Sequence, residues 1–224
     1  MIEWLALILL VPVILVPIVL LFGFAGCTFP HAYPPELPPD EPTPEPTPEP
    51  PIFEKAFEAT LTVNEQRENR CIVQRIEPVR LLKSGNEVRI TLQRPSAGNL
   101  VIKSISISHA ADTPGADLYD SAGVPTLVPG APFLLPTDPG NAAVELMAVS
   151  FPLDQTKPLL VAFDIDDPGN VRRSSTGAEA DSAAFVGPLR NPPLHEAAIG
   201  DRRSYGYSRE ERTYLVQRID VREV

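Results

Sequence analysis

The 224-residue chain has little of what most functional classes require. It contains two cysteines, three histidines and one tryptophan. Two cysteines are too few for a disulfide scaffold or for a zinc site built from thiolates. Lys and Arg number 19 against 29 Asp and Glu, which gives a net charge of -10. Because a nucleic-acid binder needs a basic face, this balance predicts no nucleic-acid partner.

Basic residues are missing altogether from the first 51 positions. Within this stretch, residues 4–29 carry no charge and are rich in Leu, Ile and Val. A helix needs roughly 20 apolar residues to cross a bilayer, and this run is longer. The sequence therefore predicts a transmembrane signal anchor or a lipoprotein signal over residues 1–29.

Two interpretations of that segment stay open. The run Phe24-Ala25-Gly26-Cys27 resembles a bacterial lipobox, in which Cys27 is lipidated and the chain is cut before it. Glu3 stands where signal peptides carry Lys or Arg, which favours an uncleaved anchor instead. Both interpretations tether the protein to a membrane. The acidic flank after the segment favours a C-terminal part outside the cytoplasm. The positive-inside rule gives little information here, because residues 1–51 contain no Lys or Arg.

Residues 30–51 are predicted to form an extended linker. Eleven of these 22 residues are proline, and five are acidic with no base among them. Proline lacks the amide donor that helices and sheets need, so polyproline II is expected, at about 3.1 Å per residue. The linker then spans roughly 65–70 Å and acts as a spacer between the bilayer and a domain. A docking site for a polyproline-binding partner is the alternative.

Residues 52–224 are numerous enough to form a domain with its own core. Strand periodicity dominates, as in the alternation of apolar Val88, Ile90 and Leu92 with polar neighbours. Short strands separated by Pro and Gly predict an all-β fold, an antiparallel β-sandwich of the jelly-roll kind. The other predicted strands are residues 101–108, 144–148, 159–163 and 214–221.

Some details of this domain are open to more than one interpretation. In the second strand Val101, Ile105 and Ile107 alternate, with Ser104 out of phase, which indicates a β-bulge. Residues 72–77 and 215–220 are nearly identical, so the two segments either pair as neighbouring strands or match by coincidence. One helical turn is expected at residues 208–212.

The domain resembles uncharacterised β-sandwich accessory modules of bacterial surface and phage-tail-associated proteins. The resemblance covers most of residues 70–221 and implies a jelly-roll module for carbohydrate binding or surface attachment. Its motifs are structural, so they carry no residue role over to this chain. The matching pieces are residues 87–92, 119–121, 152–154, 157–164, 201–202, 206–207 and 214–216.

Catalytic motifs are scarce. No Gly-x-Ser-x-Gly elbow occurs, which removes the commonest signature of serine hydrolases. His109 and His195 are the histidines of the domain, and no sequence motif links either to a nucleophile. Cys71 lies in an apolar strand and is expected to be a small buried hydrophobe. We therefore expect a protein that is not an enzyme.

The most suggestive acidic run follows the buried strand at residues 159–163. Asp164, Asp166, Asp167 and Asn170 offer the hard oxygen ligands that calcium prefers. The spacing does not match an EF-hand, so the alternative is a solvated turn at the end of the strand. Asp164 and Asp166 also form a weak candidate for the paired carboxylates of a glycoside hydrolase. No cofactor other than Ca²⁺ is suggested.

The second candidate site is the loop that contains Arg202, Arg203, Tyr205 and Tyr207. Aromatic rings stack on sugars and arginines donate hydrogen bonds to hydroxyl groups, so this loop is a candidate glycan-binding site. The alternative is that the tyrosines pack the loop onto the domain.

Together these features predict a membrane-tethered module outside the cytoplasm that binds or organises a cell-surface component without catalysis. The expected partner is a glycan or a surface protein. The alternatives are a hydrolase acting on polysaccharide and a structural subunit of an envelope or phage-derived assembly. Nothing in the sequence indicates an oligomeric state.

Overall fold

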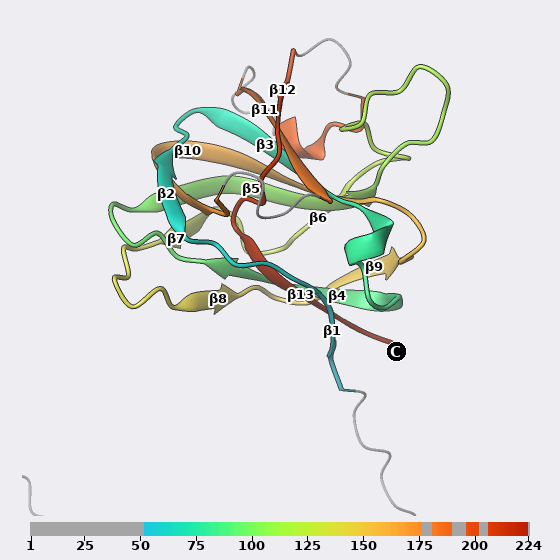
Figure 1. Ribbon diagram of the computed structural model, residues 1–224, viewed down its shortest axis with the longest axis horizontal. Coiled ribbons are helices and arrows are strands. Elements are labelled where there is room, and N and C mark those ends of the chain that lie inside the picture. Colours follow the sequence, from blue (N-terminus) through green and yellow to red (C-terminus); the bar gives the residue numbers. More distant parts are fainter. Residues whose placement is uncertain (1–51, 176–180, 190–195, 202–205, 224) are drawn as a thin grey trace, which may run out of the picture. The chain divides into compact units, whose positions relative to one another are not determined.

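Two antiparallel β-sheets packed face to face form the body seen in the computed structural model, which describes residues 52–175, 181–189, 196–201 and 206–223 (Figure 1). The predicted membrane segment and linker lie outside these residues. Within them there is no α-helix, and no helix is long and apolar enough to cross a membrane. The all-β, antiparallel part of the fold prediction is confirmed.

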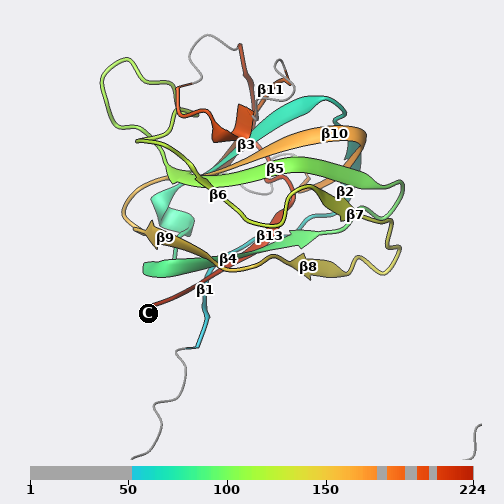
Figure 2. The ribbon, with the colours of Figure 1, turned by 180° about the vertical axis from the view of Figure 1, so that it is seen from behind.

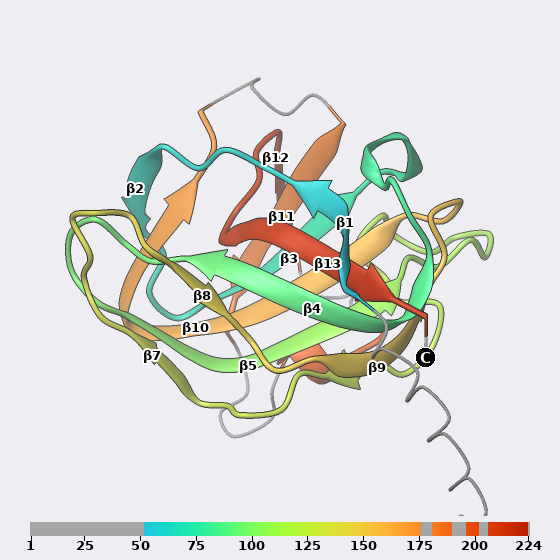
Figure 3. The ribbon, with the colours of Figure 1, turned by 90° about the horizontal axis from the view of Figure 1, so that it is seen from below.

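The small sheet has five strands in the described part of the chain. Its order is β1 (Glu54–Glu58), β13 (Val216–Arg222), β4 (Gly85–Gln93) and β8 (Ala143–Glu145). The fifth strand, β9 (Val149–Leu153), pairs with β4 as well. Figure 3 shows this sheet in front of the larger one.

The large sheet contains the other eight strands of the described residues. Its order is β12 (Ser208–Glu210), β11 (Ser182–Pro188), β3 (Arg70–Ile76), β10 (Leu159–Arg173), β5 (Leu100–His109) and β6 (Thr126–Leu127). Two short strands complete it, β2 (Val63–Gln66) beside β10 and β7 (Phe133–Leu135) beside β5. Two single 3₁₀ turns are η1 (Pro78–Arg80) and η2 (Glu196–Ala198).

The core lies between the sheets and is built by strand alternation. In β10, Leu159, Val161 and Phe163 point into it and are fully buried, which confirms the predicted buried run. In β4, Val88, Ile90 and Leu92 meet them from the small sheet. Burying each such side chain contributes about 1.5–3 kcal/mol. The members of this core among the described residues all lie between residues 56 and 221, and we expect residues 52–224 to fold as a domain.

A bulge in β5 confirms the predicted break at Ser104 but changes which residues face the core. Asp164 of β10 lies opposite Ser104, and the next residue, Ile165, lies opposite Ile102. Lys103 is therefore the extra residue of the bulge. As a result Ile102 is fully buried in the core and Val101 is only half-buried, so the prediction that Val101 faces inward was wrong.

A second apolar layer covers the outer face of the large sheet. Its buried members include Leu160 and Phe185, with Ala197 of η2 packed over them. Cys71 is fully buried in this layer, as predicted. Figures 1 and 2 show η2 on the side of the large sheet that faces away from the small sheet. Residues 159–165 of β10 are consequently buried on both faces of the strand.

One local prediction was wrong, and one of the two interpretations of the similar segments is excluded. The helical turn expected at residues 208–212 is largely the short strand β12, which pairs with β11. The similar segments 72–77 and 215–220 are not neighbours, because β3 belongs to the large sheet and β13 to the small one. The two segments have different neighbouring strands: β3 lies between β10 and β11, and β13 lies between β1 and β4.

Candidate functional site

The acidic run predicted as a turn at a strand end lies inside β10, so that local prediction was wrong. Ile165 pairs with Ile102 and Gly169 with Leu100, so three residues of β10 stand opposite one residue of β5. After this bulge β10 continues beside β2. The strand persists because β2 supplies a new hydrogen-bonding partner, a contact that the local sequence does not reveal.

The predicted metal ligands are held by separate partners. Asp164 is fully buried and accepts hydrogen bonds from the Ser104 hydroxyl and from the Ala197 amide, the latter at 3.0 and 3.1 Å. Asp166 forms an ion pair with Lys103 at 3.0 Å.

Asp167 is exposed, and the Asn170 amide donates to the Asn99 carbonyl at 3.2 Å. Within the described ranges no group of three or more His, Cys, Asp or Glu side chains is placed to hold a metal ion. The structure therefore does not bring the predicted ligands together, and calcium binding stays a prediction.

Of the predicted glycan loop, only Tyr207 lies among the described residues. Arg202, Arg203 and Tyr205 lie outside them, as does the lipidation candidate Cys27. The Tyr207 ring is half-buried, with its centroid 4.8 Å from that of Tyr119.

The backbone of β11 passes directly beneath the Tyr207 ring. A methyl group added at Gly187 would come within 2.8 Å of that ring. Tyr207 thus packs onto the outer apolar layer, and a role in sugar binding stays a prediction.

His109 has main-chain neighbours at both ring nitrogens. Its Nδ1 lies 3.3 Å from the Pro158 carbonyl oxygen, and its Nε2 lies 3.1 Å from the amide nitrogen of Asp154. The ring also stacks against Phe151 at 5.2 Å. His195, the other candidate base, lies outside the described residues.

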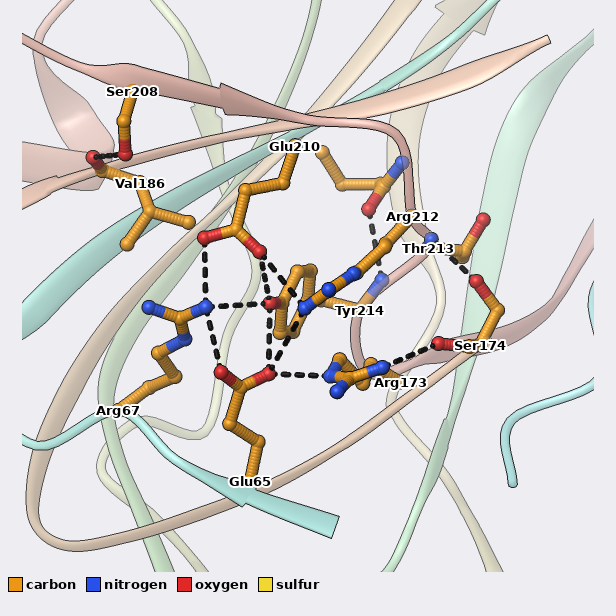
Figure 4. Close-up of polar contacts among 11 residues, drawn as sticks. Glu65, Arg67, Arg173, Ser174, Val186, Ser208, Glu210, Arg212, Thr213 and Tyr214 are labelled. Carbon is orange, nitrogen blue, oxygen red and sulfur yellow. Dashed lines mark hydrogen bonds and ion pairs between the residues drawn. The ribbon is translucent and has the colours of Figure 1, made fainter. Parts of the chain in front are cut away.

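The densest group of charges in Figure 4 surrounds the Tyr214 hydroxyl. We call it the Tyr214 cluster; its members are Glu65, Arg67, Arg173, Glu210, Arg212 and Tyr214. The hydroxyl lies 2.7 Å from Glu210 and 3.0 Å from Glu65, and it accepts a hydrogen bond from Arg67 at 3.0 Å. Arg67 also pairs with both carboxylates at 2.7 Å.

The remaining arginines close the Tyr214 cluster. Arg173 pairs with Glu65, and Arg212 lies 3.3 Å from Glu210. Burial raises the pKa of Tyr214 above its ordinary value, and its hydrogen bond to Glu210 adds to this, while Arg67 opposes it. The acids and bases of the cluster form ion pairs with one another. These ion pairs connect β2, the end of β10 and the segment before β13, so we expect the cluster to stabilise the packing of these segments.

A different arrangement of charge occupies the outer face of the small sheet. The strand register places Arg218 of β13 beside Glu58 of β1 and beside Thr91 of β4, and Thr91 in turn beside Glu145 of β8. The neighbouring row joins Lys55, Asp220 and Arg89. Since alternate residues of a strand share a face, both rows point outward. We call this surface the charged face; its members are Lys55, Glu58, Glu87, Arg89, Thr91, Glu145, Arg218, Asp220 and Arg222.

Ion pairs on the charged face run both between strands and along β13. Arg89 of β4 lies 2.9 Å from Glu145 of β8. Within β13, Arg218 lies 2.6 Å from Asp220, which is only 2% exposed. Arg222 pairs with Glu87. Cross-strand pairs of opposite charge of this kind stabilise a sheet modestly.

Three hollows follow one another along β4. The first, of about 360 Å³, is lined by Arg89 and Thr91 together with Ala143 and Gln217. The second, of about 330 Å³, contains Asn86 and Glu87, Ser150 and Arg222. The third, of about 410 Å³, lies around residues 84–86. Each volume falls within the range of small-ligand sites.

The sequence alone did not indicate the charged face as a candidate site. The alternation of Glu87, Arg89 and Thr91 with buried residues indicated an outward polar stripe on β4. The strands that would lie on either side of it were not apparent, so the hollows could not be predicted. In comparisons with known proteins, no family model matches the chain and no curated protein is significantly similar to it.

Proposed function

We propose that this protein is a membrane-tethered, extracytoplasmic and non-catalytic module that binds a cell-surface component through the charged face. The observation that carries the proposal is the line of three hollows along β4. The anchor or lipoprotein signal at residues 1–29, the linker and the jelly-roll form of the sandwich are parts of the same proposal.

The lining of the first hollow favours binding over catalysis. Each of its carboxylates lies beside a base: Glu58 beside Lys55 at 2.7 Å, Glu145 beside Arg89, and Asp220 beside Arg218. For Glu58 the hydrogen bond from Lys55 and its charge lower the pKa of the carboxyl group, which favours the ionised form that accepts hydrogen bonds. A general acid for glycoside hydrolysis is instead a carboxyl group kept protonated by an apolar environment.

The sheet also holds the hollows in place. Thr91 and Arg218 sit on two central strands of the small sheet, whose inward neighbours Ile90 and Ile219 are buried in the core. Side chains on such strands are positioned before a ligand arrives, which lowers the entropic cost of binding.

The binding part of the proposal can be tested with Thr91→Lys, which places a long cation in the middle of the first hollow. Thr126→Lys is the matched control, because Thr126 is also a half-buried strand threonine but lies on the large sheet. We expect the full-length protein in detergent to sediment with cell envelopes of its own host. Thr91→Lys should abolish this and Thr126→Lys should not. Equal binding by both variants would contradict the proposal, and release of soluble sugar during the assay would favour a hydrolase.

The tether is tested by the intact mass of protein extracted from membranes. Lipidation at Cys27 removes residues 1–26 and adds acyl chains, whereas a signal anchor keeps the full-length mass. We expect one of these two species in the membrane fraction, with residues 52–224 sensitive to external protease in intact cells. An unmodified protein recovered in the soluble fraction would contradict the tether.

A structural subunit is a second candidate, favoured by the edge of the large sheet formed by β6 and β7, beyond which no further strand pairs among the described residues. Leu127 of β6 is 50% exposed and Leu134 of β7 is 67% exposed, and both strands lie at that edge. Exposed apolar side chains on an edge strand favour association with another chain. Concentration-dependent oligomers that Leu134→Asp abolishes would support this function.

A further inference from the structure

We infer that the charged face binds a neutral oligosaccharide, an inference that rests on the proposed function and names its ligand class. Three features support it: the pairing of charges in the first hollow, two polar atoms there without partners, and the alignment of the hollows along one strand.

The paired charges favour a neutral ligand. An anionic chain in the first hollow would lie against three carboxylates, those of Glu58, Glu145 and Asp220. A cationic chain would find each of these already beside a lysine or an arginine. A polyol is repelled by neither sign, and its neighbouring hydroxyls match the paired oxygens of carboxylates and the paired N–H groups of guanidinium groups.

Two lining residues carry polar atoms that nothing satisfies. The Gln217 Oε1 and Arg89 Nε atoms are buried and have no hydrogen-bond partner among the described residues. One is an acceptor and the other a donor, and buried polar atoms are normally paired. A hydroxyl group both donates and accepts, but both atoms are covered by the protein, so a polyol reaches either one only after the side chain turns outward. The terminal torsion of a glutamine is soft, so the Gln217 amide turns toward a ligand at little cost.

The alignment of the hollows favours a chain over a single sugar. The three hollows extend along β4 from Ser84 to Thr91. At about 3.3 Å per residue this distance is roughly 23 Å, which exceeds a monosaccharide. Extended peptides bind sheets mainly through backbone hydrogen bonds at an edge, whereas this surface presents side chains. An oligosaccharide is therefore the better fit.

The affinity should be low. No aromatic side chain lines the three hollows in the described part of the chain. The Phe53 ring, close by, is already covered by the guanidinium groups of Arg89 at 4.3 Å and Arg222 at 4.6 Å. Without an aromatic stacking platform, we expect a dissociation constant of about 1 mM. Many copies tethered to one membrane compensate for this weak affinity by avidity.

The inference is tested by ligand-observed NMR with the full-length protein in detergent. The probes are neutral hexasaccharides of glucose, mannose, xylose and N-acetylglucosamine, with an oligogalacturonate and an uncharged capped peptide for comparison. We expect at least one neutral hexasaccharide to bind. Thr91→Val and Gln217→Leu should each weaken binding about 3- to 10-fold, which corresponds to one lost hydrogen bond. Thr126→Val should leave it unchanged.

Failure of this inference can be separated from failure of the proposed function. If the protein sediments with envelopes in a Thr91→Lys-sensitive manner but binds no neutral hexasaccharide, the ligand class is wrong and the function stands. Stronger binding of the oligogalacturonate or of the peptide also overturns the ligand class. If neither envelopes nor any probe bind, both are wrong.

Discussion

The Tyr214 cluster and the charged face are made of the same residue types but differ in access to water. In the cluster the charged side chains are 15–25% exposed. On the charged face Glu58, Glu145 and Arg218 are 43–54% exposed, whereas Glu87, Arg89 and Arg222 are 21–28% exposed and Asp220 is enclosed, at 2%. Charges withdrawn from water are costly unless each is paired, and once paired they hold segments together. Charges on an open face contribute little to stability and remain accessible to a ligand. This difference in exposure is consistent with our proposal that the charged face binds a ligand, and it predicts that the cluster contributes more to stability.

Arg67→Leu should produce the largest effect and so tests the comparison most directly. It removes the cation that joins Glu65, Glu210 and the Tyr214 hydroxyl. Breaking a fully buried pair costs about 3–5 kcal/mol, and partial exposure reduces this to about 2–3 kcal/mol. Urea unfolding of residues 52–224 measures the change. Arg89→Leu is the control on the charged face and should cost about 1 kcal/mol or less. If Arg67→Leu and Arg89→Leu lower the free energy of unfolding equally, the expected difference between the Tyr214 cluster and the charged face is contradicted.

Tyr214→Phe should have the next largest effect at neutral pH. It deletes the hydroxyl in the middle of the cluster while keeping the buried ring. Loss of a hydrogen bond to charged groups is expected to lower the free energy of unfolding by about 1–2 kcal/mol. Tyr119→Phe, which removes the hydrogen bond to the Asp117 carboxylate, should cost less. If Tyr214→Phe leaves the free energy of unfolding unchanged, the hydroxyl does not stabilise the cluster.

Alkaline pH should weaken the fold through the same tyrosines. Burial raises the pKa of Tyr214, and burial together with Asp117 raises the pKa of Tyr119 to about 12. A raised pKa means that the native state keeps a proton which the unfolded state loses near pH ~10. Stability is therefore complete below pH ~10 and falls as the pH rises through the native pKa values. Thermal unfolding across this range should show a shallower fall for Tyr214→Phe, and an unchanged slope would contradict the prediction.

Glu145→Gln should have the smallest effect. Its carboxylate is exposed and pairs only with Arg89 among the described residues, so the loss should be about 0.5 kcal/mol or less and should vanish in about 1 M salt. Glu65→Gln is the matched change in the cluster, where three arginines pair with the carboxylate. It should cost about 1–2 kcal/mol and depend less on salt. A larger loss from Glu145→Gln would reverse the comparison.

Strand periodicity predicted individual strands better than their partners. The inward residues of β4 and the buried run of β10 followed from alternation and apolar content alone. The match between residues 72–77 and 215–220 did not indicate pairing, because two strands with the same pattern fit any sheet that offers a partner. The β5 bulge was indicated, but which residues it turned inward depended on the register against β10.

The candidate sites likewise combine features that the local sequence indicates with features that depend on strand pairing. The acidic residues 164–170 suggested a turn because Asp, Pro and Gly are typical of turns. Instead β2 extends the ladder, and Gly169 lies against the Arg67–Glu68 backbone, where an added methyl group would approach within 2.7 Å. The charged face was not predicted, since its rows combine residues from β1, β4, β8 and β13.

What the sequence alone determined is therefore the all-β class, the inward and outward faces of β4, the buried run at the start of β10 and the burial of Cys71. These depend on local alternation of apolar and polar residues, which fixes the face of a strand that is buried. Only the tertiary structure decided which strands are neighbours, which charges are enclosed around Tyr214 and where hollows remain on the charged face. Strand pairing joins segments far apart in the chain, and the free energy of a charge depends on the surroundings that this pairing creates.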